Sequence, residues 1–181
     1  MGHANTGRHS DEYVRVPKAS IRIAQPLSRI VDELEDKADQ FVAIFVPGGH
    51  GAMLGIPEDP NVGTILRWAH SHQLFTISIC HGPGALLATS IGENDFLYAG
   101  YEMAVFPDSV DKQTPIIGYL PGQMPWQLGA KLQELGVKIV NQKGDDTCCI
   151  DRKLITGASP AAADKLGQLA ASTLLEHLAQ T

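Results

Sequence analysis

The chain has 181 residues, 44% of them hydrophobic, which suits one globular domain. Its 20 acidic side chains outnumber 14 Lys and Arg for a net charge of −6, which argues against nucleic-acid backbone binding as the main role. The sequence has neither an apolar run of roughly 18 residues nor a hydrophobic signal core near its start. Three cysteines do not make a disulfide framework, so we expect a soluble protein of the reducing cytoplasm.

The first part of the chain alternates helical and strand patterns after residue 20. Residues 1–20 contain Gly, Asn, His, Ser and both charges without a periodic pattern, which predicts a poorly ordered lead-in. Residues 21–181 are expected to form a single domain. In chain order, the patterns that follow are a helix from Pro26, a strand over 41–46, a helix from Pro60 capped by Asp59, a strand over 74–79 and a helix directly after Cys80. The run over 41–46 is uninterrupted and apolar, which is typical of a strand covered on both faces, and the strand over 74–79 is also expected to be buried.

The second part continues this alternation. The patterns predict a strand over 103–105, a helix over 128–135 that Gly136 closes, strands over 137–140 and 154–156, and a last helix that Ser159 caps and Pro160 opens. Strands alternating with helices indicate an α/β fold with a mostly parallel sheet.

A glycine-rich segment, 47–55, follows the first strand but does not match a nucleotide-binding loop. It lacks the Gly-Lys-Ser/Thr ending of a P-loop, and Leu54 stands where the dinucleotide fingerprint requires glycine. Two interpretations remain open: a tight strand-to-helix turn, or a close backbone approach that offers N–H groups to a ligand.

Cys80 ends a strand and precedes a helix, with the small residues Gly82, Pro83 and Gly84 after it. This is the pattern of a nucleophile elbow with cysteine in place of serine. The partial positive charge at a helix N-terminus favours a thiolate, and thiolate is the nucleophilic form. The alternative is a buried, inert cysteine; in this context we favour the nucleophile.

A thiolate nucleophile usually needs a base and a group that orients the base. His81 can act as the base if the turn brings its ring beside the thiol; otherwise it faces solvent. Asp108 and Asp111, after the strand over 103–105, are the carboxylate candidates.

Other chemistry-bearing residues carry no predicted site. Cys148 and Cys149 are interpreted as residues at the end of a strand, and His70 and His72 as solvated groups at the end of a helix. No further ligands at zinc-site spacing accompany them.

Four motifs together resemble the ThiJ/PfpI superfamily, and within it the heat-shock branch of glyoxalase III enzymes and protein deglycases. They are Pro-Gly-Gly-His-Gly (47–51), Ser-Ile-Cys-His-Gly-Pro (78–83), Phe-Pro-Asp-x-x-Asp-Lys-Gln-Thr-Pro (106–115) and Gly-Tyr-Leu-Pro-Gly (118–122). The resemblance covers residues 40 to 178. It implies a flavodoxin-like three-layer sandwich, a homodimer and catalysis without a cofactor.

The resemblance also implies roles for individual residues. Cys80 is the nucleophile, His81 its partner and Asp111 the carboxylate that orients the histidine, while the backbone N–H groups of Gly49 and His81 form an oxyanion hole. The implied reactions convert methylglyoxal to D-lactate without glutathione and remove early glycation adducts from proteins and nucleotides. The branch also implies a stress chaperone that binds unfolded clients. The alternatives are a non-catalytic holdase, a redox sensor based on Cys80, and a truncated, inactive family member.

Two family features have no match in this sequence. One is a Glu that contacts the nucleophilic thiol, because the upstream acids Glu33, Glu35 and Asp36 fall on a predicted helix. The other is the branch's His-Glu-His metal site, so no metal ligand is assigned. The chain therefore resembles the C-terminal two-thirds of such a protein. We expect the first strands of the sheet to be missing, with an apolar edge exposed unless another chain covers it.

Overall fold

The computed structural model describes residues 24–180. The α-helices are α1 (Leu27–Asp32), α2 (Pro60–Ser71), α3 (Asp108–Asp111), α4 (Leu128–Glu134) and α5 (Ala163–Leu178). The 3-10 helices are η1 (Glu35–Gln40), η2 (His50–Met53), η3 (Ile56–Glu58), η4 (Gly82–Ser90) and η5 (Pro160–Ala162). The strands are β1 (Ala43–Val46), β2 (Phe75–Ile79), β3 (Glu102–Met103), β4 (Lys138–Ile139), β5 (Cys148–Asp151) and β6 (Leu154–Gly157).

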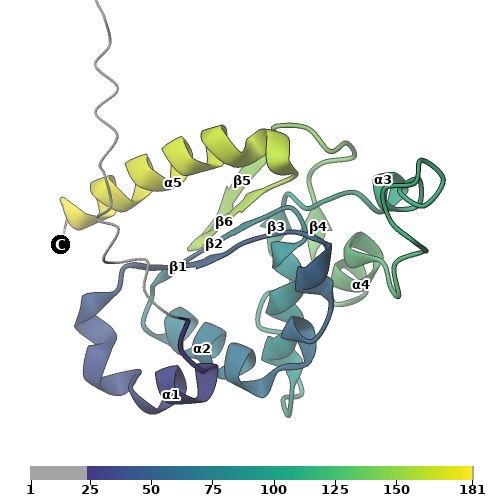
Figure 1. Cartoon of the computed structure of the whole chain (residues 1–181). Helices are drawn as coiled ribbons and strands as arrows, with labels where there is room; N and C mark the ends of the chain where they lie inside the picture. The colour runs from purple at the N-terminus through teal and green to yellow at the C-terminus, as the bar shows by residue number, and fades with distance from the viewer. Residues whose placement is uncertain (1–23, 181) are drawn as a thin grey trace, which may run out of the picture.

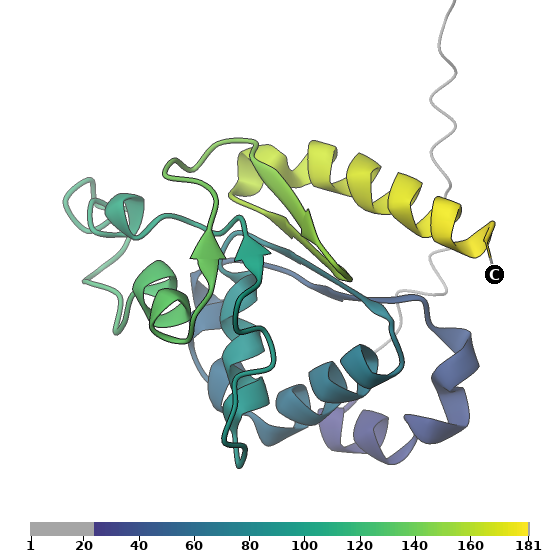
Figure 2. The ribbon, with the colours of Figure 1, turned by 180° about the vertical axis from the view of Figure 1, so that it is seen from behind.

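A four-stranded sheet in the order β1-β2-β6-β5 lies between two layers of helix, with α5 on one face and α2 and η4 on the other (Figure 1). The β1–β2 and β2–β6 pairs are parallel, whereas β5 runs antiparallel to β6. Seen from behind, β3 and β4 form a short parallel pair beside α4 (Figure 2). Helices on both faces of a mostly parallel sheet confirm the predicted α/β class.

The local sequence signals account for the helix ends. The Asp59 carboxylate accepts a hydrogen bond from the Asn61 N–H at the start of α2. In the same way, the Ser159 hydroxyl oxygen accepts one from the Ala161 N–H where η5 leads into α5. After α4 the chain turns at Gly136, whose φ of +90° suits a residue without a Cβ. These predicted boundaries are confirmed, and the segment after Cys80 is helical as expected, in the 3-10 form.

Three local predictions are wrong. β1 is the edge strand of the sheet and is not covered on both faces, since Phe45 on it is 58% exposed. Cys148 and Cys149 do not end a strand but begin β5, which has too short an apolar pattern to be recognised from the sequence. His70 is not simply solvated, because its Nε2 lies 3.1 Å from the Tyr101 hydroxyl.

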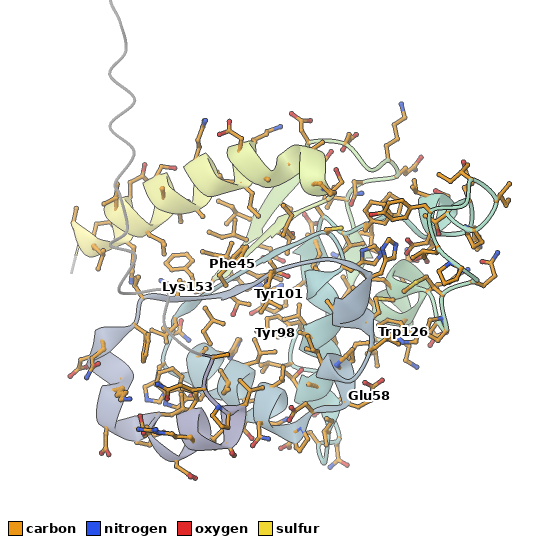
Figure 3. All side chains as sticks on the ribbon, in the orientation of Figure 1. Phe45, Glu58, Tyr98, Tyr101, Trp126 and Lys153 are labelled. Atoms are coloured by element: carbon orange, nitrogen blue, oxygen red, sulfur yellow. The ribbon has the colours of Figure 1, made fainter. Side chains whose placement is uncertain are left out.

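The core packs against both faces of the sheet. On the α5 side, Phe75, Ile77 and Ile155 pack against Leu166. On the other side Tyr98 and Tyr101 lie beneath the strands, within a larger cluster that reaches α4 (Figure 3). This packing fixes the carboxyl ends of β1 and β2 side by side, and these ends carry the glycine-rich segment and Cys80.

Within residues 24–180, no helix has both the length and the apolar character needed to cross a membrane. The expected lead-in over 1–20 lies outside the described residues. The division into a lead-in and one domain over 21–181 stays a prediction.

Candidate active site

Cys80 follows β2 in a backbone conformation that L-residues rarely adopt, with φ at +63°. Its N–H donates to the Gly157 carbonyl at 2.8 Å, and its own carbonyl accepts from the Phe106 N–H at 2.9 Å. The strained residue is therefore held from both sides by the ends of neighbouring segments.

Two glycines make this sharp turn possible. A Cβ at Gly48 would lie 2.7 Å from the Cys80 Cβ, and a Cβ at Gly82 would lie 2.6 Å from the Val46 carbonyl oxygen. Real Cβ atoms do not approach that closely, so the loop after β1 can lie against the turn after β2 only with glycine at both positions. This observation explains the small residues around the predicted elbow.

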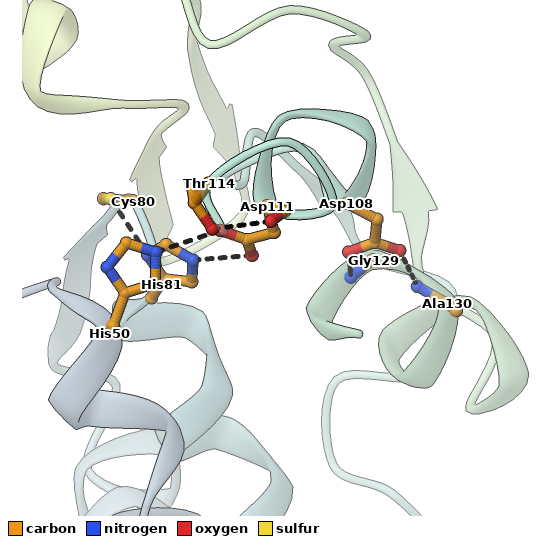
Figure 4. Close-up of polar contacts among 8 residues, drawn as sticks. All are labelled: His50, Cys80, His81, Asp108, Asp111, Thr114, Gly129 and Ala130. Atoms are coloured by element: carbon orange, nitrogen blue, oxygen red, sulfur yellow. Dashed lines mark hydrogen bonds and ion pairs between the residues drawn. The ribbon is translucent and has the colours of Figure 1, made fainter. Parts of the chain in front are cut away.

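The structure joins the three predicted side chains by hydrogen bonds (Figure 4). The Cys80 Sγ lies 3.3 Å from the His81 Nδ1, and the His81 Nε2 lies 2.8 Å from an oxygen of Asp111. Asp111 ends α3, where the Thr114 hydroxyl donates to its carbonyl. His81 and Asp111 are both buried, at 1% and 3% exposure. Their roles in a reaction stay predictions.

The hydrogen bonds change the charge states of the buried pair. Burial lowers the pKa of His81, but the hydrogen bonds to Asp111 and Cys80 outweigh burial and raise it to about 9. Burial raises the pKa of Asp111, but the hydrogen bond and positive charge of His81, together with the hydrogen bond to His50, lower it overall. At neutral pH the pair is therefore an imidazolium beside a carboxylate.

Asp108, the other predicted carboxylate, points away from the thiol. Its two oxygens accept hydrogen bonds from the Gly129 and Ala130 N–H groups at the start of α4, both at 2.8 Å (Figure 4). Asp108 thus joins α3 to α4, and this contact holds in place the short helix that carries Asp111.

His50 is a site residue that the sequence analysis missed. It lies on η2, and its Nε2 is 3.0 Å from the Asp111 oxygen that His81 does not use. The ring centroids of His50 and His81 are 4.4 Å apart. The signal for it was present in the Pro-Gly-Gly-His-Gly motif, where the glycines drew attention and the histidine did not.

The two amides assigned to an oxyanion hole lie at the same place. Gly49 has φ at +104°, a conformation that favours glycine. Within the described chain, the N–H groups of Gly49 and His81 donate no hydrogen bond to protein. Both residues line the cavity that contains Cys80. Their role as an oxyanion hole stays a prediction.

This cavity has a volume of about 490 Å³ and mostly apolar walls. Ile117 and Tyr119 stand at its rim, at 74% and 69% exposure, and Phe106 closes one side. A small carbonyl compound or a modified side chain would fit such a space, with the Cys80 sulfur in its wall.

Metal-ligating atoms also meet here. One atom each of His50, His81 and Asp111 lie within 4.8 Å of one another. The two histidines already hydrogen-bond the two Asp111 oxygens, which accounts for the cluster without an ion. We therefore assign no metal to this cluster.

The other two free thiols lie elsewhere. Cys148 and Cys149 are consecutive residues of β5, so their side chains leave opposite faces of the strand and do not form one site. Burial raises the pKa of each thiol.

The sequence model of the DJ-1/PfpI family matches residues 5–104, more than half of the chain. The chain belongs to the DJ-1/PfpI family. This confirms the resemblance noted from the motifs.

Named relatives agree with this assignment. The protein/nucleic acid deglycase HchA of Escherichia coli (strain K12 / DH10B) is 44% identical over 171 residues, which are 92% of this chain and 59% of the relative. The HchA deglycase of Escherichia coli O157:H7 is 45% identical over 158 residues, 87% of this chain and 55% of that protein. The chain thus spans less than two thirds of the length of these relatives.

Among solved structures, glyoxalase III from Candida albicans has the same fold. It superposes with a TM-score of 0.59 at 18% identity, covering 74% of this chain and 58% of that one. The 24 kDa rapid encystment protein of Francisella tularensis gives a TM-score of 0.62 at 21% identity, covering 86% and 74%.

Proposed function

We propose that this DJ-1/PfpI protein is an aldehyde-processing cysteine enzyme that needs no cofactor, of the glyoxalase III and deglycase type. The observation that carries the proposal is the connected set of Cys80, His81 and Asp111 at a cavity with two unpaired amides. The deglycase names of its relatives support the same chemistry. The substrates we propose are methylglyoxal and its early adducts on proteins and nucleotides.

The reaction begins with addition of the Cys80 thiolate to the aldehyde carbon. The new S–C bond sends the carbonyl electron pair to oxygen, where the Gly49 and His81 N–H groups receive the negative charge. The His81 imidazolium, held by Asp111, supplies the proton that completes the hemithioacetal. Transfer of a proton from the first to the second carbon then gives a thioester, and water releases D-lactate and the thiol.

Cys80→Ser tests the proposal. Wild type should consume methylglyoxal and form lactate without glutathione, and Cys80→Ser should lose this activity. Cys148→Ser is the matched control, because Cys148 is also a free thiol but lies on β5, outside the cavity. Equal rates for wild type and Cys80→Ser would refute the proposal.

A second candidate function, a chaperone for unfolded clients, is favoured by exposed apolar side chains. Phe45, Ile116 and Ile117 are 58%, 80% and 74% exposed. If the protein is such a holdase, the Cys80→Ala variant should still suppress the aggregation of a heated client protein. Failure of that variant and wild type alike to suppress aggregation would exclude it.

We also propose a homodimer in the cytoplasm, where reduced thiols persist. The three free cysteines support that compartment. The exposed β1 edge with Phe45 supports coverage by another chain. Light scattering on the full chain tests the dimer, and a monomer at all concentrations would contradict it.

A further inference from the structure

The ring nitrogens of the two histidines in the site are used differently. Both nitrogens of His81 are engaged, Nδ1 with the Cys80 sulfur and Nε2 with Asp111. His50 uses only Nε2, toward the other oxygen of Asp111. Its Nδ1 has no partner among the described residues, and Figure 4 shows this nitrogen on the side of the ring turned away from Asp111.

The contact with Asp111 also fixes the tautomer of His50. An ionised carboxylate only accepts hydrogen bonds, so Nε2 must carry the hydrogen. In the neutral ring, Nδ1 then carries a lone pair that no hydrogen bond uses. The rings of His81 and Tyr119 flank this imidazole, with centroids 4.4 and 5.7 Å away, and hold it at the wall of the cavity.

The proposed reaction has a second proton transfer to which the steps above assign no base. After the sulfur has added, a proton must leave the first carbon and a proton must reach the second. His81 acts in the preceding step, in which the nitrogen beside the sulfur gives its proton to the substrate oxygen while Nε2 stays on Asp111. His50 lines the same cavity and has a nitrogen without a protein partner among the described residues, so it can serve as a second, separate base.

We propose that His50 is a second catalytic residue, which carries the proton from the first to the second carbon of the bound aldehyde. This inference rests on the proposed function. Nδ1 takes the proton from the first carbon, and the C–H electron pair forms a double bond to the second carbon, whose oxygen becomes an anion. Nδ1–H then protonates the second carbon, while the hydroxyl proton of the first carbon moves to that oxygen. The first carbon is oxidised and the second reduced, so no outside oxidant is needed.

Asp111 supports this role by its position. When Nδ1 takes a proton the ring becomes positive, and its Nε2–H already donates to the carboxylate at 3.0 Å. Asp111 thus orients two histidines, one beside the sulfur and one beside the substrate carbons.

His50→Gln separates proton transfer from a structural role. The glutamine amide can donate to Asp111 in place of Nε2, but it has no basic nitrogen. We expect kcat for methylglyoxal to fall by at least about 100-fold, with KM nearly unchanged. Mass spectrometry should then find an aldehyde adduct accumulating on Cys80, while alkylation of Cys80 by iodoacetamide keeps its wild-type rate. His72→Gln is the matched control, because His72 lies outside this cavity, and it should keep full activity.

A second measurement covers the case in which His50→Gln does not fold. His50→Ala should lose activity and regain part of it when imidazole is added, because the cavity can admit a small base. A fully active His50→Gln, or a His50→Ala that imidazole does not restore, overturns the inference while activity still depends on Cys80. Absence of turnover by wild type, or equal activity in Cys80→Ser, overturns the proposed function and this inference together.

Discussion

Replacement of Asp111 by asparagine should change the charge on His81 and thereby the reactivity of Cys80. Asp111 is the carboxylate that hydrogen-bonds both histidines of the site. Asparagine keeps the size of the side chain and one acceptor oxygen but removes the negative charge. Burial lowers the pKa of His81, and without the negative charge of Asp111 less counteracts this effect. We therefore expect the ring to be mostly neutral at pH 7.

The size of the effect follows from the pKa of His81. The rise in the pKa of His81 from 6.5 to about 9 corresponds to about 3 to 4 kcal/mol of folding free energy, at about 1.4 kcal/mol for each pH unit. Because the folded-state pKa lies above the unfolded one, this stabilisation is complete below about pH 6.5 and is lost as the pH rises through about 9. Wild type should therefore lose more stability than Asp111→Asn between these two pH values.

Nuclear magnetic resonance of the imidazole measures the change directly. His81 should titrate near pH 9 in wild type and below pH 7 in Asp111→Asn, with aldehyde turnover at pH 7 reduced by at least about 100-fold. Urea unfolding at both pH values gives the stability difference. A His81 titration near 6.5 in wild type, or one that Asp111→Asn leaves in place, would refute this account of the site.

Three substitutions test the packing around the site. Gly82→Ala should destabilise the fold by about 2 kcal/mol or more and abolish turnover, because its Cβ would lie 2.6 Å from a carbonyl oxygen. Thermal unfolding measures the loss. Gly51→Ala is the control and should be neutral, because a Cβ at Gly51 has nothing within 4 Å. Asp108→Ala should cost about 1–2 kcal/mol in urea unfolding, because the start of α4 loses two acceptors, and an unchanged midpoint would show that this link is unimportant. Leu132→Ala should cost about 2–5 kcal/mol since Leu132 is fully buried, whereas Leu175→Ala, at 68% exposure, should cost little; similar losses in both would contradict the described core.

Regular patterns in the sequence predicted the architecture. The apolar run at 41–46 and the strand pattern at 74–79, each followed by helical spacing, were enough to predict an α/β class with parallel strands. Asp59, Ser159 and Gly136 marked helix ends because capping depends on residues within a few positions of each other. Local sequence also predicted that Cys80 lies at a sharp turn, because the small residues that such a turn requires are adjacent to it in the chain.

Periodicity was less informative where burial depends on position in the sheet. The run over 41–46 resembles a covered strand, yet β1 is at the edge and exposes Phe45. β5 carries too short a pattern to detect and is defined by its pairing with β6. An apolar run reports what a strand can bury, whereas its neighbours decide what it does bury.

The sequence alone determined which residues carry the chemistry of a thiol and an adjacent imidazole: Cys80 and His81 are neighbours in the chain, and a strand end puts them at a turn. Only the tertiary structure decided which carboxylate serves them and that a second histidine joins. Asp108 and Asp111 lie on one short helix, but one caps α4 while the other meets His81 and His50, 30 and 61 residues away. Contacts over such separations depend on how whole elements pack, because local patterns constrain the direction of a side chain but not its distant partner.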